Sequence, residues 1–228
     1  MASVSVKHID LNILNMKTRM PFRYGIAALV AVPHLFVRVE AEFDGKIGTG
    51  ISADGLPPKW FTKNPEVPFS ADLEEMFAVI RQACRLAAAA DPADTVFEFW
   101  LNLYAAQKEW AVETTYPPLL WAFGVSLVER ALIDAFCRIR ALPFGRALTQ
   151  NAFGIRLGEI HQELDHLNPI DLLQAEASRS IWARHTVGLT DPLTDADIPD
   201  EERLNDGLPQ SLEASVLAYG LNHLKIKL

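Results

Sequence analysis

Cysteine, clustered positive charge and long apolar runs are all scarce in this sequence, and each absence removes a class of protein. Only two cysteines occur among 228 residues. Cys84 and Cys137 lie inside apolar helical patterns, not at the spacing of a metal or redox site. We therefore expect buried, reduced thiols and no disulfide.

Nucleic acid and membrane are excluded as partners by charge and hydropathy. The formal net charge is -8, and lysine and arginine do not gather into the positive surface that phosphate binding needs. No apolar run approaches the roughly 18 residues that span a bilayer. The first ten residues lack the basic and apolar regions of a signal peptide, so we expect a cytoplasmic protein.

Glycine-rich phosphate loops are also missing. The nearest pattern, Gly48-Thr-Gly50, lies inside a predicted strand and is followed by no lysine at the required spacing. A nucleotide-binding function is therefore disfavoured.

What is present is an apolar half that can form a core, with 22% charged residues. The first part predicts a three-stranded antiparallel sheet, with strands from Val4 to Leu11, over 35–43 and over 46–51. Asp44-Gly45 favours a tight hairpin between the last two strands. Residues 18–25 mix aromatic and basic side chains and predict a loop, in the simplest interpretation a polar connector with Phe22 packed beneath it.

Three helices are predicted next. Ser70 is the expected cap of the first, which ends at Asp91-Pro92, and Thr95 with Glu98 forms a capping-box signature for the second. Pro117-Pro118 opens a third helix, reaching Ile139, whose wide apolar stripe predicts burial against several neighbours. The charged row Arg130, Asp134 and Arg138 lies on one side of that helix and predicts surface ion pairs of structural value only.

The last part predicts a strand over 181–189, a helix over 209–219 capped by Gly220, and a strand over 221–228. Strand, helix and strand in this order form a parallel crossover unit. The long acidic loop over 191–206 could bind a cation, but it lacks the spacing of a calcium loop. A solvated loop is the favoured interpretation.

Two lysines stand on one face of that last strand, because Lys225 and Lys227 alternate with Leu224, Ile226 and Leu228. Repulsion between neighbouring ammonium groups favours the neutral form of one, which could then accept a proton. The other could hold an anionic substrate. Taken alone, such a pair near the end of a chain is more often a solvated strand edge.

A family resemblance gives the pair its context. The run from Gly124 to Leu148, with Glu129-Arg-Ala-Leu-Ile-Asp134 followed by Leu142-Pro143, resembles the last capping-domain helix of the enolase superfamily, in its mandelate racemase and muconate lactonising branch. The opening sheet is similar to the capping domain of that family. The run from Tyr219 to Lys227 resembles its second barrel strand.

The resemblance implies a fold and a chemistry. It implies an α+β capping domain over residues 1–150, a connector over 151–180, and over 181–228 the first two strands and one helix of an α/β (TIM-type) barrel that the chain does not complete. Enzymes of the family remove the proton α to a carboxylate and stabilise the enediolate on Mg²⁺. By position, Lys227 would be the base and Lys225 would assist at the carboxylate, while Phe22, Arg23 and Tyr24 would contact substrate from the capping loop.

The expected function follows from what the resemblance covers. We expect the N-terminal part of a racemase, epimerase, dehydratase or cycloisomerase acting on a small carboxylate, inactive by itself, with the Mg²⁺ ligands and the second acid or base on later strands. The chain alone is expected to bind no Mg²⁺, and a homo-oligomer or association with the rest of the barrel is expected. The alternative is a non-catalytic protein that keeps the capping fold for interaction. The substrate and the choice among these reactions are not readable from the sequence.

Overall fold

The computed structural model describes residues 3–24, 27–174, 178–188 and 190–226, without the side chains of Arg23, Tyr24 and Ala27. Contacts divide the chain into two compact units. The first consists of Met1–Thr18 and Ala31–Ala177, and the second of Arg19–Val30 and Ser178–Leu228. The second unit therefore combines a short segment near the start of the chain with its last part.

A three-stranded sheet opens the fold. Its strands β1 (Val4–Tyr24), β2 (Ala27–Phe43) and β3 (Lys46–Gly55) are paired in chain order. Phe43 pairs with Lys46 across a two-residue turn in which Asp44 and Gly45 have φ of 51° and 78°. Positive φ at both positions matches the twist of the flanking strands, which confirms the predicted hairpin. In the first unit, alternate residues of β2 from Leu35 to Phe43 are buried.

The first two strands are longer than predicted. Strand β1 runs through Tyr24, so residues 18–24, predicted as a loop, are extended and paired. The side chain of Phe22 is 43% exposed and does not lie beneath a connector. The prediction was wrong because apolar and polar residues alternate along a strand only where one of its faces is buried. Ile13 and Leu14 point to opposite faces and are 51% and 55% exposed, so backbone pairing extends the strand without alternation.

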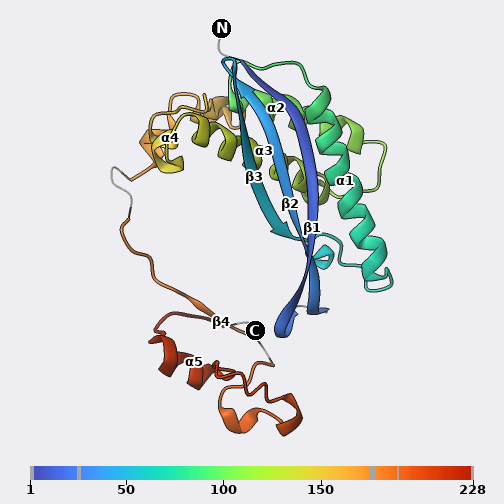
Figure 1. Ribbon diagram of the computed structural model, residues 1–228, viewed down its shortest axis with the longest axis vertical. Helices are drawn as coiled ribbons and strands as arrows, with labels where there is room; N and C mark the ends of the chain where they lie inside the picture. The colour runs from blue at the N-terminus through green and yellow to red at the C-terminus, as the bar shows by residue number, and fades with distance from the viewer. Residues whose placement is uncertain (1–2, 25–26, 175–177, 189, 227–228) are drawn as a thin grey trace. The chain divides into compact units, whose positions relative to one another are not determined.

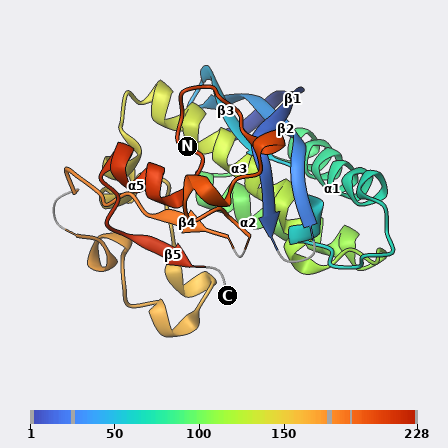
Figure 2. The ribbon, with the colours of Figure 1, turned by 90° about the horizontal axis from the view of Figure 1, so that it is seen from below.

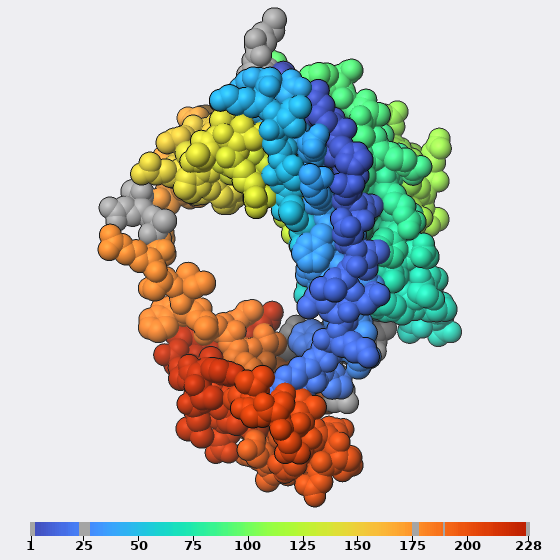
Figure 3. Space-filling model, viewed as in Figure 1, coloured from blue at the N-terminus to red at the C-terminus, as the bar shows by residue number. Residues whose placement is uncertain are grey.

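Three helices cover one face of the sheet in the first unit, as Figure 1 shows for α1 (Phe69–Ala89), α2 (Val96–Ala111) and α3 (Pro118–Ile139). Helix α3 contacts β3, α1 and α2, and its buried stripe runs from Leu120 to Phe136. The predicted central helix is therefore confirmed. Side chains of β1 and β2 lie at the surface in Figure 3, on the face of the sheet turned away from these helices.

Glycines allow the closest approach of these layers. A Cβ atom added at Gly50 would lie 2.1 Å from the carbonyl oxygen of Ala131 and 2.2 Å from the amide nitrogen of Ala135. One at Gly124 would lie 2.5 Å from the carbonyl oxygen of Val79 in α1. Gly50 therefore serves the contact between β3 and α3, in agreement with the rejection of a phosphate loop.

Helix starts are partly as predicted. Thr95 caps α2, since its Oγ1 accepts a hydrogen bond from the Glu98 amide at 3.0 Å. Helix α1, however, begins at Phe69 after Pro68, and Ser70 lies inside it without capping. Asp72 in the first turn is buried and pairs with the Nζ of Lys59 at 2.5 Å, so a tertiary ion pair holds this end.

The charged row on α3 is only partly internal to the helix. Arg138 pairs with Asp134 at 2.9 Å, whereas Arg130 pairs with Asp54 of β3 at 3.0 Å. Asp134 also accepts the backbone N–H of Ile51 at 2.9 Å. The row therefore joins α3 to the edge strand, in agreement with its predicted structural role.

The rest of the first unit consists of short helices. Helix α4 (Phe144–Thr149) is followed by short 3₁₀ helices at Leu157–Glu159, Gln162–Leu164 and Pro169–Leu172, and another, Pro58–Trp60, precedes α1. Both cysteine thiols are free, and Cys84 is buried as predicted, whereas Cys137 is only half-buried. Burial raises the pKa of the Cys84 thiol to about 12.

The second unit contains a parallel strand pair. Strands β4 (His185–Val187) and β5 (Leu224–Ile226) pair in parallel, with α5 (Leu212–Tyr219) between them in the chain, and Figure 2 shows the two strands side by side. The predicted strand, helix and strand are confirmed, with shorter bounds. Helix α5 begins at Leu212 because the Ser211 hydroxyl accepts the Ala214 amide, and it ends at Gly220 with φ of 60°.

Two further 3₁₀ helices, Asp195–Asp197 and Asp200–Glu202, lie in the acidic loop. Among the described residues, no helix combines the length and the apolar character that crossing a membrane requires.

Candidate functional site

The predicted catalytic strand lies in the second unit, and its register fixes the neighbours of Lys225. Thr186 of β4 is the pairing partner of Lys225, while His185 and Val187 pair with Leu224 and Ile226. Paired residues of neighbouring strands point to the same face of a sheet. The Thr186 hydroxyl therefore shares the face of Lys225, and the other two pairs share the opposite face. Sequence reasoning did not single out Thr186, because register between strands is not local.

Strand β5 is exposed on both of its faces, whereas Val187 of β4 is buried. Lys225 is exposed, and Leu224 and Ile226 are 43% and 64% exposed. A parallel sheet is normally covered on both faces. Lys227, the predicted base, lies outside the described residues.

An aromatic contact borders the polar face. The ring of Trp182, just before β4, stacks on the ring of His223, just before β5, with centroids 5.2 Å apart. The His223 carbonyl accepts the His185 amide at 3.0 Å, which extends the strand pairing by one bond. The start of β5 is therefore fixed by backbone and side chain together.

The acidic loop uses its carboxylates within the protein. Asp191 accepts the Gly188 amide at 2.6 Å, and Asp197 accepts the Thr194 amide at 2.8 Å. The Ser211 hydroxyl donates to Asp195 at 2.6 Å. No group of three His, Cys, Asp or Glu side chains that could hold a metal occurs among the residues that the structure describes. The three carboxylates named above therefore stabilise turns and a helix start of this unit.

The tip of the β1–β2 hairpin belongs to the same unit as the lysine strand. Residues Arg19–Val30 group with Ser178–Leu228, so the predicted substrate-contacting segment and Lys225 are parts of one compact unit. The backbone of Phe22, Arg23 and Tyr24 is extended within β1. The side chains of Arg23 and Tyr24 lie outside the described part of the chain.

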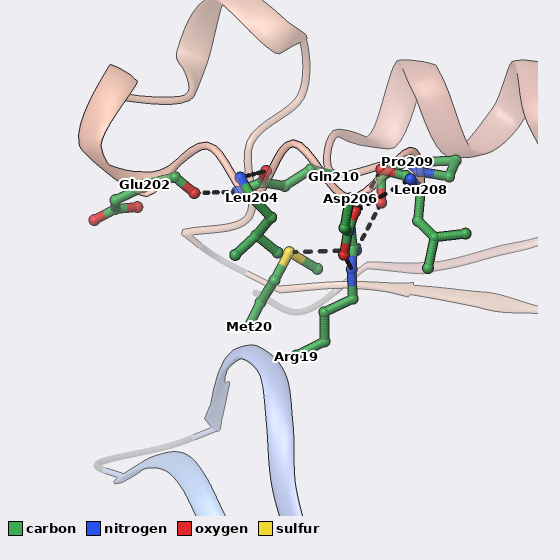
Figure 4. A network of polar contacts seen from close by, with 8 residues as sticks. All are labelled: Arg19, Met20, Glu202, Leu204, Asp206, Leu208, Pro209 and Gln210. Carbon is green, nitrogen blue, oxygen red and sulfur yellow. Dashed lines mark hydrogen bonds and ion pairs between the residues drawn. The ribbon is translucent and has the colours of Figure 1, made fainter.

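A residue that sequence reasoning missed holds this tip. Arg19 forms an ion pair with Asp206, with Nε 2.6 Å from Oδ2, as seen in Figure 4. Hydrogen bonds from the guanidinium and from the Leu208 amide lower the pKa of Asp206 to about 2. The bond with Asp206 also raises the pKa of Arg19. The two residues are 187 positions apart, and no local pattern connects them.

The first unit contains an acid whose pKa is raised by burial and a pocket. Burial raises the pKa of Glu129 on α3 to about 7, although the charge of Arg130 opposes the shift. A pocket of about 570 Å³ includes Asp44 and Arg140 in its wall, but these two form an ion pair with each other. The pocket therefore presents no free charge from this pair to a ligand.

Comparison with known proteins bears on the fold. No protein-family model and no curated protein matches the sequence. Among solved structures, an enolase from Bradyrhizobium, crystallised with magnesium and mandelic acid, matches 99% of this chain at 16% identity with a TM-score of 0.54. The chain has the fold of the N-terminal part of an enolase chain. The predicted resemblance is thereby confirmed at the level of architecture, an antiparallel sheet with helices followed by a small parallel sheet.

The match covers only part of the larger chain. This chain spans 46% of the length of the Bradyrhizobium enolase, corresponding to its N-terminal part. A mandelate racemase/muconate lactonizing enzyme-like protein from Rubrobacter xylanophilus matches 64% of this chain at 19% identity, with a TM-score of 0.41. An enolase from an alpha proteobacterium, crystallised with bound magnesium, matches 62% at 17% identity, with a TM-score of 0.41.

Proposed function

We propose that this chain is the N-terminal part of a magnesium-dependent enzyme that removes the proton α to a carboxylate and stabilises the enediolate. Racemisation, epimerisation, dehydration and cycloisomerisation of a small carboxylate share this enolate intermediate. The observation that supports the proposal most is the enolase fold over nearly the whole chain, shared with a protein crystallised with magnesium and mandelic acid. Mandelic acid is itself a small carboxylate with an acidic α-hydrogen.

The lysine strand would supply the proton acceptor. Lys227 would take the α-proton onto its neutral amine, leaving the electron pair of the broken C–H bond in the enediolate. Lys225 would stay protonated and interact with the substrate carboxylate. Thr186, paired with Lys225, could donate a hydrogen bond to the same carboxylate from the same face of the sheet.

The hairpin tip would close the site from the other side of the substrate. Phe22, with an exposed ring, and its neighbours Arg23 and Tyr24 would supply apolar and cationic contacts. The tip and the lysine strand belong to one compact unit, which is what such a shared role requires.

The described residues do not fit a magnesium site. Mg²⁺ needs several oxygen ligands, usually carboxylates, and no suitable group of acidic side chains occurs in the described ranges. We therefore propose that the metal ligands belong to further polypeptide, on the same or a second chain, and that this chain contributes proton transfer and substrate binding only. The expected cytoplasmic location and the expected assembly with further barrel strands remain predictions.

Hydrogen–deuterium exchange at the α-carbon tests the proposal without knowledge of the final product. The polypeptide encoded by the complete gene is incubated in D₂O with Mg²⁺ and a panel of carboxylates that includes mandelate, and loss of the α-proton signal is followed by NMR. Lys227→Ala should slow exchange by roughly a hundred- to ten-thousand-fold, the usual contribution of a general base. Lys17→Ala, which removes a lysine from the first unit, should leave the exchange rate unchanged.

Two results would contradict the proposal. Exchange at the wild-type rate in the Lys227→Ala variant would remove the base assignment. No exchange with any carboxylate would instead favour the second candidate, a non-catalytic interaction domain. That alternative gains support from the exposure of Lys225.

A further inference from the structure

Arg19 is bonded through its whole guanidinium group. Nε and Nη2 donate to the two carboxylate oxygens of Asp206 at 2.6 and 2.7 Å, and Nη2 also donates to the Leu208 carbonyl at 3.0 Å. Nη1 donates to the Pro209 carbonyl at 2.9 Å and contacts the sulfur of Met20 at 3.9 Å. The five N–H groups of an arginine side chain are thereby all directed at acceptors (Figure 4).

The loop that receives Arg19 is braced by its own hydrogen bonds. The Gln210 side chain donates to the Glu202 carbonyl at 2.8 Å and accepts the Leu204 amide at 3.1 Å. Asp206 accepts the Leu208 amide at 3.1 Å, and Gly207 turns the chain with φ of 79°. These bonds do not involve the hairpin. The carboxylate and the two carbonyls are therefore held in place by the loop itself, which lowers the entropic cost of binding the guanidinium.

The hairpin needs such an attachment. A two-stranded ribbon is at best marginally stable in water without packing on one face. Within this tip, Phe22 is 43% and Val30 57% exposed, so apolar burial gives it little support. Arg19 stands three residues before Phe22, and its bidentate geometry with Asp206 gives two parallel charge-assisted hydrogen bonds at side chains that are 31% and 37% exposed.

We propose that Arg19 is a positioning residue that latches the β1–β2 hairpin tip to the loop formed by residues 204–210. The latch fixes the extended segment from Met20 to Tyr24 against the part of the second unit that leads into α5. A consequence for substrate binding, through Phe22, Arg23 and Tyr24, rests on the proposed function. The latch itself does not, because it is a contact within this chain.

Amide hydrogen exchange of the full chain, measured by mass spectrometry without ligand or metal, tests the latch. Arg19→Gln and Asp206→Asn should each raise exchange in peptides covering residues 20–24 and 204–210 by about tenfold, the loss expected for a bidentate charged pair. Exchange in α2 and α3 should stay at the wild-type rate, which shows that the variants are folded.

Matched variants separate the bond from the charge. Lys17→Gln removes the same charge from the same strand, at an exposed side chain with no ion pair among the described residues, and should leave both peptides at wild-type rates. Arg19→Lys keeps the charge but loses the fork of donors and should exchange nearly as fast as Arg19→Gln. The double variant Arg19→Gln/Asp206→Asn should exchange no faster than either single variant, because both remove one interaction.

Equal exchange in Arg19→Gln and Lys17→Gln would overturn the latch, as would additive effects in the double variant. A variant that also loses protection in α2 and α3 is not correctly folded. The test of the latch then rests on Asp206→Asn and on the charge-swapped pair Arg19→Asp/Asp206→Arg. If amide exchange at residues 20–24 is no slower in the swapped pair than in Arg19→Asp alone, a direct bond is refuted. None of these results depends on catalysis, so failure of the proposed function and failure of the latch are distinguishable.

Discussion

Glutamine in place of Glu129 should stabilise the protein at alkaline pH and not at acid pH. Glu129 is half-buried on α3, and burial raises the pKa of its carboxyl from 4.5 to about 7. The raised pKa means that the folded chain keeps a proton which the unfolded chain releases between these two values. Unfolding therefore becomes easier as pH rises through this interval, and stability is largest below pH 4.5.

The size of the effect follows from the same two values. Each pH unit between 4.5 and 7 lowers the free energy of unfolding by about 1.4 kcal/mol, so the ionised group costs at most about 3 kcal/mol above pH 7. Glutamine keeps the shape and polarity of the side chain but never ionises. Glu129→Gln should therefore be more stable than wild type by up to about 3 kcal/mol at pH 8, and of similar stability near pH 4.5.

Urea unfolding followed by circular dichroism at a series of pH values measures this difference. Glu109→Gln, at an exposed carboxylate of α2, controls for the change in net charge. An equal gain at both ends of the pH range would show that repulsion or packing, and not ionisation, explains the change. No gain at pH 8 would refute the burial argument.

Two further variants test the packing of the helices. Gly50→Ala should destabilise the chain by about 3 kcal/mol or more, because the new methyl group meets the backbone of α3. Gly145→Ala, with open space around it, should leave the melting temperature unchanged in thermal unfolding. Equal melting temperatures of the two variants would refute the close contact. Gln107→Leu should change stability by less than about 1 kcal/mol. The substitution removes two hydrogen bonds, which the side-chain amide donates to the Val79 and Trp121 carbonyls, together with a buried Oε1 that has no partner among the described residues. A loss of several kcal/mol in urea unfolding would show that this oxygen has a partner.

The sequence by itself determined the local elements, because each depends on residues close together in the chain. Asp44-Gly45 adopts the positive φ values that its hairpin requires, and Gly220 adopts the left-handed cap predicted for it. Thr95 caps its helix through Glu98, three residues later. The apolar stripe of α3 predicted its burial for the same reason.

The candidate site was predicted less completely. Lys225 was found by strand alternation, and the resemblance of the whole chain placed it on a parallel strand, where the structure has it. Thr186 was missed because its place beside Lys225 depends on register across a helix and two loops. Arg19 and Asp206 were missed because nothing in either local sequence marks a partner 187 positions away.

Tertiary structure alone decided how far β1 and β2 extend, which unit the hairpin tip joins, and where charged side chains find partners. The start of α1 is held by the ion pair of Asp72 with Lys59 and not by a Ser70 cap. Asp134 accepts a hydrogen bond from the backbone N–H of Ile51. Local patterns measure which residues a helix or strand buries. They do not measure complementarity between surfaces that folding brings together, and that complementarity determines these contacts.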